Sequence, residues 1–387
     1  MLEHSGLKVS SLYISQIKPK CGLEVGKNYN QPKSEDPRQS QCPLEKEKAI
    51  KEARALLHFG MNSAGRRLCA LNSMKKTLTN GRITMRVLSK EQLNRMNDWM
   101  QIYARPYDRA KWNYLFNGGS KDAIVEEMLK YQNADGGMGS GFEADVLCPL
   151  SAAIPTAEAI FQAYEYNLDC TADWFKTILA YFENSVQDIP KYWEDSPKEA
   201  MDYPHAPWWN YAPCTVFSPN PCAVVASAMI RYGTESQKQL GLKIADDCFK
   251  LLIGDGLCGD HDTLNIQALV EQLTQIRSPL ISDEVMKSMR RRILDNTCFD
   301  TSKYAGYFFT PLDFVSSPNS IWYDDVKHGI EQTFDYWLDN INEQGVWNPN
   351  FSWGIDSDVS RQVTQNWKGY ITVKRAKILL NFGRIEK

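Results

Sequence analysis

Two carboxylates close a glycine-dense stretch at residues 131–145, which reads Tyr-Gln-Asn-Ala-Asp-Gly-Gly-Met-Gly-Ser-Gly-Phe-Glu-Ala-Asp. They are Glu143 and Asp145, and in an extended segment residues two apart point to the same side. Carboxyl groups in a partly buried mouth can have a pKa raised toward neutrality, which suits general acid–base catalysis or the holding of a cation. In the alternative interpretation, both carboxylates accept hydrogen bonds from amides of the glycine turn or of a nearby helix start. The sequence leaves both interpretations open.

One histidine lies in a loop rich in proline and tryptophan, Pro204-His205-Ala206-Pro207-Trp208-Trp209. Imidazole titrates near neutral pH, so His205 could act as a proton shuttle. A histidine that only fixes the conformation of its loop is the favoured alternative. We therefore take Glu143, Asp145 and His205 as the candidate catalytic residues.

Four tryptophans are candidates for binding a substrate: Trp208, Trp209, Trp353 and Trp367. Indole faces stack on sugars and on planar or cationic groups. Ordinary aromatic packing between helices is the favoured alternative for any one of them. The chain contains 11 tryptophans, and 11% of its residues are aromatic, so it has enough large flat side chains for both roles.

The ten cysteines form no metal-binding pattern, because Cys-x-x-Cys is absent and the nearest pairs lack zinc-finger spacing. Asp246 and Cys248 are two apart on an expected helix, about 200° around its axis, so they do not share a face. We predict that Cys248 is a core residue and that Asp246 is solvated. At the start of another expected helix, Asp260, His261 and Asp262 form a polar cluster, in which capping is favoured over a ligand role. We therefore expect no metal and no cofactor.

Charge is unevenly distributed along the chain. Residues 1–84 carry 15 Lys and Arg against 7 Asp and Glu, whereas residues 85–387 carry 29 against 40. Nucleic-acid binding needs clustered Lys and Arg to neutralise phosphates, so we do not expect the acidic part to bind nucleic acid. No apolar run reaches the roughly 20 residues that span a bilayer, and no secretory signal is visible near residue 1. We predict a cytoplasmic protein with reduced thiols and no membrane span.

Apolar residues recur at helical spacing through most of residues 89–387. Ser89 followed by Gln92 is a capping-box signature for the first helix. No strand ladder is recognisable, so the predicted fold class is all-α. The predicted helices cover residues 90–103, 108–116, 121–132, 156–166, 171–186, 223–232, 236–253, 263–276, 282–294, 325–341 and 368–382.

The first 84 residues differ from the remainder in being polar and basic, with one short helical candidate at residues 43–59. We predict that residues 1–84 are a poorly ordered basic extension and that residues 85–387 form the folded domain. Two further possibilities stay open for the extension. One is a basic arm for an anionic partner, and the other is a start codon placed upstream of the true one at Met74 or Met85.

A glycine turn between two expected helices occurs three times in the sequence. Residues 135–139 read Asp-Gly-Gly-Met-Gly, residues 254–260 read Gly-Asp-Gly-Leu-Cys-Gly-Asp, and residues 343–347 read Glu-Gln-Gly-Val-Trp. Helix pairs joined in this way cannot bury both faces alone, so they must stack side by side. Long insertions at residues 187–221 and 298–320 indicate loops gathered around a mouth.

The first of these turns resembles the repeat of protein prenyltransferase β-subunits and of terpenoid cyclases, through Gln132, residues 135–139 and the helix that contains Thr156. A group of uncharacterised bacterial proteins is similar over about residues 90–387. Their similarity lies in Ala104-Arg105-Pro106, Tyr131-Gln132-Asn133, Glu143-Ala144-Asp145, residues 204–209, Pro311-Leu312-Asp313-Phe314, Trp367-Lys368-Gly369 and Phe382-Gly383-Arg384-Ile385. The resemblance implies an α/α toroid, in which a double ring of helices surrounds a central cavity.

The chemistry of these families does not follow from the fold alone. The Asp-x-Asp-Asp acid motif of terpenoid cyclases and the Asp-Asp-x-x-Asp diphosphate motif are both missing from this sequence. The leading hypothesis is a small-molecule enzyme that uses acid–base chemistry on an apolar or isoprenoid-like substrate in an acidic, aromatic-lined cavity. The alternatives are a non-catalytic ligand- or peptide-binding toroid, and a carbohydrate-active α/α barrel, since paired carboxylates with tryptophans also occur in glycosidases.

Overall fold

A computed structural model of the 387-residue chain describes residues 85–187, 192–211, 216–254, 256 and 259–386. These residues belong to one compact unit that begins at Met85. The predictions for residues 1–84, including the helix at residues 43–59, lie outside the described residues.

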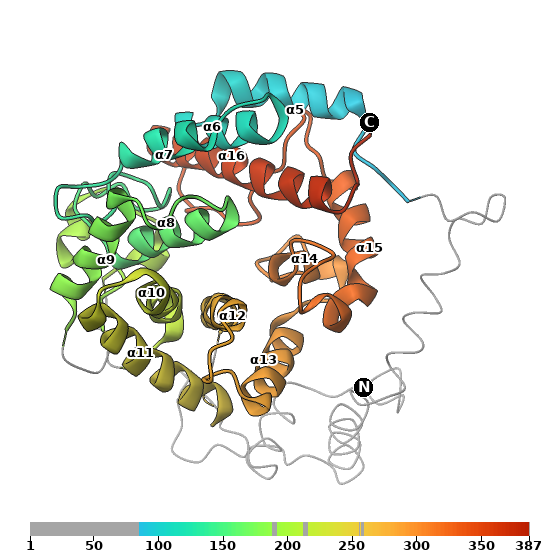
Figure 1. The fold of residues 1–387 in the computed structure, drawn as a ribbon. Helices are drawn as coiled ribbons and strands as arrows, with labels where there is room; N and C mark the ends of the chain where they lie inside the picture. The colour runs from blue at the N-terminus through green and yellow to red at the C-terminus, as the bar shows by residue number, and fades with distance from the viewer. Residues whose placement is uncertain (1–84, 188–191, 212–215, 255, 257–258, 387) are drawn as a thin grey trace, which may run out of the picture. The chain divides into compact units, whose positions relative to one another are not determined.

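The described residues form an all-α unit, which confirms the predicted fold class (Figure 1). Extended pairing within them is limited to four isolated bridges. No helix in this part of the chain is both long and apolar enough to cross a lipid bilayer. The twelve α-helices of the described residues are α5 (Lys90–Tyr103), α6 (Pro106–Phe116), α7 (Lys121–Leu129), α8 (Ala153–Glu165), α9 (Asp173–Ser185), α10 (Pro219–Tyr232), α11 (Glu235–Ile253), α12 (Asp260–Gln275), α13 (Asp283–Asn296), α14 (Pro311–Phe314), α15 (Tyr323–Asp339) and α16 (Asp358–Asn381). Three short 3-10 helices lie in the connections: η1 (Lys198–Asp202), η2 (Pro207–Trp209) and η3 (Thr301–Lys303).

Local sequence signals set several helix starts. Ser89 caps α5 with the predicted capping box: Gln92 N–H donates to Ser89 Oγ, and Ser89 N–H donates to Gln92 Oε1. Helices α6 and α10 begin at Pro106 and Pro219. Proline suits the first turn because the amide that it lacks would have no partner within the helix.

Helix α16 is longer than predicted, since it begins at Asp358 and not at residue 368. Ser357 caps its first turn, where Ser357 Oγ accepts from Ser360 N–H at 3.1 Å. Residues 358–366 are mainly polar, and Val363 is the buried apolar residue among them. The helical period is therefore too weak in these first turns to be recognised from the sequence.

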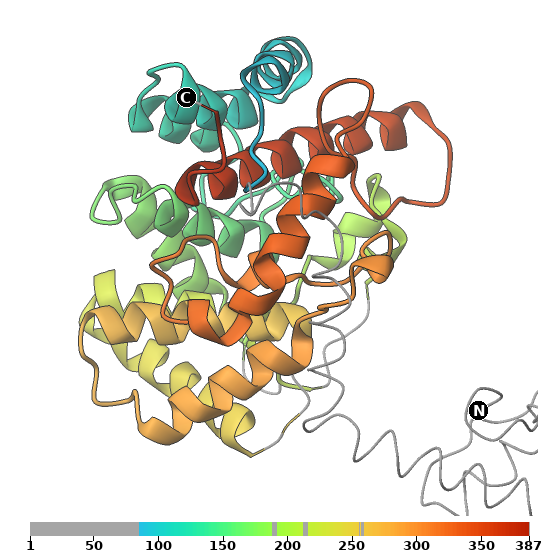
Figure 2. The same ribbon diagram turned by 90° about the vertical axis from the view of Figure 1, so that its right-hand side faces the viewer.

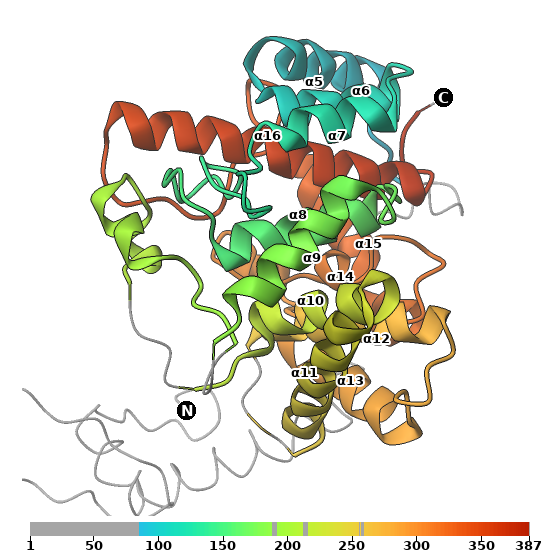
Figure 3. The ribbon, with the colours of Figure 1, turned by 60° about the vertical axis from the view of Figure 1, so that its left-hand side comes forward.

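Successive helices pack against one another, and the last returns to the first. Figure 3 shows α8 to α11 following one another, with α10 packed against α8, α9 and α11. Figure 2 shows α15 between α13 and α16; α15 packs against α13, and Arg375 of α16 lies over the ring of Trp337 of α15. Helix α16 in turn packs against both α5 and α6 (Figure 1). The C-terminal helix therefore lies beside the first helices of the unit.

One continuous apolar core runs through the unit, from Leu88 to Leu379. A buried indole ring is stabilised by apolar contacts but loses free energy if its N–H lacks a partner. A buried indole whose N–H has an acceptor therefore both packs in the core and keeps a fixed orientation. Four buried tryptophans donate to an acceptor within the core: Trp112 to Asn97, Trp193 to Phe182, Trp322 to Glu271 and Trp347 to Trp337.

Two of the three glycine turns have the same backbone conformation. In each, the turn glycine donates its N–H at 2.9 Å to the carbonyl of an asparagine three residues earlier, Gly136 to Asn133 and Gly345 to Asn342. Both glycines have positive φ, 91° and 86°, a conformation that side chains with Cβ resist. Part of the third turn, residues 255 and 257–258, lies outside the described residues.

A buried threonine ties each of these two turns to the next long helix. Met138 N–H donates to Thr156 Oγ1 at 2.8 Å, and Trp347 N–H donates to Thr372 Oγ1 at 3.4 Å. Neither threonine is exposed. The repetition recognised at residues 135–139 and 343–347 is therefore a repetition of structure as well as of composition.

Candidate functional site

The glycine turn between α7 and α8 leads directly into Glu143 and Asp145. Arg105, the residue before α6, donates from Nη1 to the carbonyl oxygens of Gly141 at 3.1 Å and Phe142 at 3.2 Å. An arginine can bridge two carbonyls because its planar guanidinium carries five N–H donors. The backbone is therefore fixed immediately before the first carboxylate.

Asp145 is buried, with 2% of its surface exposed, and its carboxylate is held by indole N–H groups. Oδ1 accepts from Trp353 Nε1 at 2.7 Å and from Trp367 Nε1 at 3.0 Å, and the indole of Trp208 lies close enough to influence this side chain. Burial raises the pKa of Asp145 above its usual range, and the neighbouring indoles act in the opposite direction. Neutral donors of this kind stabilise the carboxylate without cancelling its charge. We name Asp145 and these three tryptophans the indole cluster.

Glu143 lies two residues away in a different environment. Its side chain is partly buried, and its closest backbone donor is Asp145 N–H, 3.4 Å from Oε1. Burial raises the pKa of Glu143, and the negative charges of Asp145 and Glu158 raise it further, to about 8. A carboxyl group with this pKa carries a proton at neutral pH and can donate it.

His205 is fixed on both sides of its ring. Nδ1 lies 2.7 Å from the carbonyl oxygen of Tyr203, and Nε2 lies 3.0 Å from Oδ1 of Asn210. Because a carbonyl oxygen can only accept, Nδ1 carries a proton. An isolated antiparallel bridge between His205 and Val146 holds this loop beside the carboxylates. Both ring nitrogens are thus engaged in fixing the loop.

The four tryptophans selected from the sequence do not share one environment. Trp208, Trp353 and Trp367 converge on Asp145 from separate parts of the chain, whereas Trp209 packs against two small apolar clusters. Trp208 is 52% exposed and Trp353 is 8% exposed. Trp208 therefore has an open ring surface, whereas Trp353 is largely buried and donates to Asp145.

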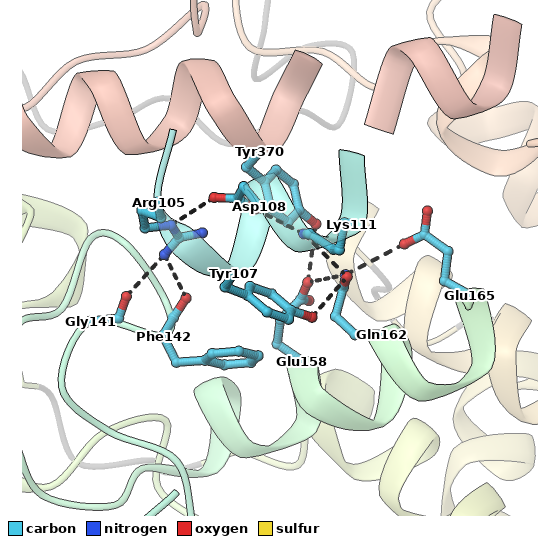
Figure 4. Close-up of polar contacts among 10 residues, drawn as sticks. All are labelled: Arg105, Tyr107, Asp108, Lys111, Gly141, Phe142, Glu158, Gln162, Glu165 and Tyr370. Atoms are coloured by element: carbon cyan, nitrogen blue, oxygen red, sulfur yellow. Dashed lines mark hydrogen bonds and ion pairs between the residues drawn. The ribbon is translucent and has the colours of Figure 1, made fainter. Parts of the chain in front are cut away.

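Figure 4 shows a buried ionic network that was not predicted from the sequence. It lies near Glu143, whose pKa is affected by the charges of Arg105 and Glu158. Asp108 is fully buried and pairs with Arg105 Nε at 2.7 Å and with Lys111 Nζ at 2.9 Å. Burial acts to raise the pKa of Asp108, but the charges of Arg105 and Lys111 outweigh it and lower the pKa. We use the name Arg105 network for Arg105, Tyr107, Asp108, Lys111, Glu158, Gln162, Glu165 and Tyr370.

Gln162 of α8 extends this network to the other helices. Its Oε1 accepts from Tyr107 OH of α6 at 3.3 Å, and its Nε2 donates to Glu158 Oε1 at 2.8 Å. Glu158 Oε1 also accepts from Tyr370 OH of α16 at 3.1 Å. One chain of polar groups therefore joins α6, α8 and α16, and it ends at Glu158, whose charge raises the pKa of Glu143.

A second set of titratable residues lies at the start of α12. His261 Nε2 is 2.9 Å from the hydroxyl of Tyr307, and burial lowers the pKa of His261, which favours a neutral imidazole. Burial raises the pKa of the neighbouring Asp260. Asp262 accepts from Gly259 N–H at 3.1 Å, so the predicted capping role is confirmed for this residue.

One aromatic ring links the second set to the indole cluster. The ring centroid of Phe351 lies 5.9 Å from those of Trp208 and Tyr307 and 5.1 Å from that of Trp367. The pKa of Tyr307 is raised to about 12, first by burial and then by nearby carboxylates, Glu143 among them. The two sets of residues therefore face a common region.

The residues considered for zinc have structural roles. Cys248 is fully buried in the core, and Asp246 pairs with Lys250 on the surface of α11 at 2.5 Å, which confirms both predictions. Within the described ranges, no three His, Cys, Asp or Glu side chains form a set that could hold a metal ion.

No protein-family model matches the sequence, and no solved structure matches the chain. The sequence does hold a signal for the Arg105 network, since Arg105, Asp108 and Lys111 are three apart and residues 158, 162 and 165 share one face of an otherwise apolar helix. No comparable local pattern joins His261 to Tyr307, which is 46 residues further along the chain.

Proposed function

We propose that the helices form an α/α toroid, with an inner and an outer layer around a central cavity. Two observations support this arrangement. Helix α16 packs against α5 and α6, and two glycine turns repeat the same hydrogen bonds. The α-helical residues of the site and its polar networks come from α6, α8, α12 and α16, and Asp313 of α14 pairs with Lys374 of α16. These are alternate helices of the chain, as expected for members of an inner layer.

We further propose that the cavity takes a small molecule and that the protein is an acid–base enzyme. The observation that carries this proposal is the pairing of Glu143, with a pKa of about 8, and Asp145, held by indole donors. Two nearby carboxyl groups in unlike environments can take separate acid and charge-stabilising roles. In the proposed reaction Glu143 donates its proton to the substrate, and the negative charge of Asp145 stabilises the positive charge that develops.

The remaining candidates receive supporting roles in this proposal. Trp208 and Trp367 contact the substrate, and Trp353 orients Asp145. His205 fixes the loop that carries Trp208, because both of its ring nitrogens already have partners. The proposed chemistry uses groups of the chain alone.

Comparative metabolite profiling tests the proposal. The full-length protein and its Glu143→Gln variant are incubated with a cell metabolite extract, and mass spectrometry identifies compounds that are consumed or formed. We expect conversion by the wild type and a loss of about 100-fold or more in the variant, because glutamine cannot transfer an acidic proton. Glu127→Gln is the matched control, since Glu127 pairs with Lys130 on the surface of α7. Equal conversion by the wild type and the Glu143→Gln variant would overturn the proposed role of Glu143.

A non-catalytic binding toroid is the second candidate, because Oδ1 of Asp145 is occupied by two indoles in a way that suits a structural carboxylate. Native mass spectrometry separates the two functions. A small molecule that co-purifies, without conversion of any compound in the extract, would favour binding alone. The carbohydrate-active alternative needs two carboxyl groups about 5–10 Å apart that both face one bond, and the engagement of Asp145 with indoles does not favour it.

A further inference from the structure

Four aromatic rings meet around Phe351. Its ring stands nearly perpendicular to the rings of Trp208 (86°), Tyr307 (75°) and Trp367 (85°). Edge-to-face contacts of this kind leave π faces that are not covered by parallel stacking. We name Phe351, Trp208, Tyr307 and Trp367 the aromatic cage.

The rings of the cage are anchored at their polar ends. Trp367 donates to Asp145 at 3.0 Å, the indole of Trp208 lies near the same carboxylate, and the hydroxyl of Tyr307 lies 2.9 Å from Nε2 of His261. Even so, Trp208 is 52% exposed and Tyr307 is 51% exposed. Large rings that are both anchored and open are preorganised for binding, since little conformational freedom is lost when a ligand arrives.

The charge beside the cage is negative and is bonded to neutral groups. Asp145 accepts from indoles, while the nearby Lys374 pairs with Asp313 at 2.9 Å. A neighbouring ring outside the cage already has a cation–π contact with a side chain of the protein. Lys111 Nζ lies 5.0 Å from the ring centroid of Tyr370, which packs against Trp367. Among the described residues, no lysine or arginine lies over a ring of the cage.

We infer that the aromatic cage binds an alkylated ammonium group carried by the ligand of this protein. The face of an aromatic ring attracts a cation through its quadrupole, and the charge of Asp145 adds to this attraction. Oδ1 of Asp145 already accepts two N–H donors. A ligand would therefore be attracted by the negative charge of Asp145 more than by a hydrogen bond to this oxygen. A quaternary or tertiary ammonium, which has few or no donors, fits this arrangement better than a primary amine or a guanidinium.

This inference rests on the proposed function only in identifying the ligand with the substrate. Cation binding itself does not require the chemistry assigned to Glu143. At neutral pH the protonated Glu143 and a glutamine in its place carry the same charge, so the Glu143→Gln variant should bind a cation as the wild type does.

A ligand-observed NMR titration of the full-length protein tests the inference. The probes are choline and 3,3-dimethylbutan-1-ol, which have the same shape but differ in charge. We expect choline to bind at least about tenfold more tightly than the neutral alcohol. We also expect Phe351→Leu and Trp208→Leu each to weaken choline binding about five- to tenfold. Tyr103→Leu is the control, since Tyr103 is a 49% exposed ring outside the cage.

The outcomes distinguish this inference from the proposed function. Equal binding of the two probes, or choline binding that is unchanged in Trp208→Leu, would overturn the cage; Trp208 is half-exposed, so its replacement is compatible with folding. Selective choline binding that survives in Glu143→Gln supports the cage. If such binding is found but Glu143→Gln and the wild type convert the same compounds, the cage stands and the proposed catalytic role fails.

Discussion

Asp145 and Glu143 show how two residues in one turn can have different hydrogen-bond partners while burial raises the pKa of both. Asp145 has N–H donors directed at one oxygen, and these oppose the effect of its burial. Glu143 has one distant amide and lies near two other carboxylates. In a medium of low polarity, a carboxyl without strong donors is more stable with its proton. The functional difference between the two residues therefore comes from their partners and not from their residue type.

The raised pKa of Glu143 predicts that the protein loses stability as the pH rises. Glu143 ionises near its ordinary value of 4.5 in the unfolded chain and at about 8 in the folded protein. Below 4.5 it is protonated in both states, and between these values only the unfolded state loses its proton, so the free energy of unfolding falls. Each unit of pKa difference is worth about 1.4 kcal/mol. Between about pH 5 and pH 9, we expect the free energy of unfolding to fall by on the order of 2–4 kcal/mol less in Glu143→Gln than in the wild type, because glutamine does not ionise.

Urea unfolding, followed by circular dichroism at several pH values, measures this difference. Glu127→Gln again serves as the control, because Glu127 lies in an ion pair at the surface of α7. Its free energy of unfolding should follow the wild type at every pH. If Glu143→Gln also followed the wild type, Glu143 would be ionised in the folded protein at neutral pH and could not be the proton donor.

At the scale of structural elements, the glycine turn at Gly136 leaves no room for a side chain. A Cβ added at Gly136 would lie 2.2 Å from the carbonyl oxygen of Thr177, and Gly136 has a φ of 91°. Gly118 also has positive φ, but no atom lies within 4 Å of its added Cβ. We expect Gly136→Ala to lower the free energy of unfolding by at least about 3 kcal/mol and Gly118→Ala by about 1 kcal/mol. Thermal and urea unfolding of the two variants measure both values, and equal losses would show that the contact with α9 does not constrain the turn.

Most of the elements could be predicted from the sequence because their signals are local. The capping box at Ser89 and the apolar period of α5 lie within a few residues of each other, and the structure confirms both. The predicted start of α16, at residue 368, was wrong because the first turns of the helix are largely polar. The four-residue helix α14 was missed for another reason, since Pro311 opens a single turn that is too short to show a period.

The site could be predicted only in part, because its defining contacts join distant residues. Asp145 and the tryptophans were selected separately from the sequence, yet 208 residues separate Asp145 from Trp353. Residue types alone do not reveal such a contact. The interpretation favoured from the sequence, ordinary aromatic packing of the tryptophans, did not include hydrogen bonds from the indoles to Asp145. The pairing of Tyr307 with His261 was missed for the same reason.

At the scale of the whole unit, the first and last described segments are joined. Leu88 N–H donates to the carbonyl of Arg384 at 2.8 Å, and Glu386 N–H donates to the carbonyl of Leu88 at 2.9 Å. Leu88 is fully buried, and Ile385 packs against the core. The contact of α16 with α5 and α6 therefore continues beyond the end of α16, and it connects the two ends of the described chain directly.

Removal of residues 384–387 should consequently weaken the whole unit and not only its C-terminal end. The shortened chain lacks both hydrogen bonds to Leu88 and the buried Arg384, which pairs with Glu331 and lies 5.3 Å from the ring of Phe334. From the loss of these contacts and of the apolar burial around them, we expect the free energy of unfolding to fall by about 2–4 kcal/mol.

Urea unfolding, followed both by circular dichroism and by tryptophan fluorescence, tests whether that loss is shared by the entire unit. Because buried tryptophans are distributed from Trp112 to Trp347, coincident transitions in both signals would mean that distant helices unfold together. A chain that ends at residue 386 is the matched control, since it keeps every contact of Leu88 and Arg384 described above. If the shortened chain unfolded at the same urea concentration and with the same slope as this control, the C-terminal segment would not join the two ends, and closure would depend on α16 alone.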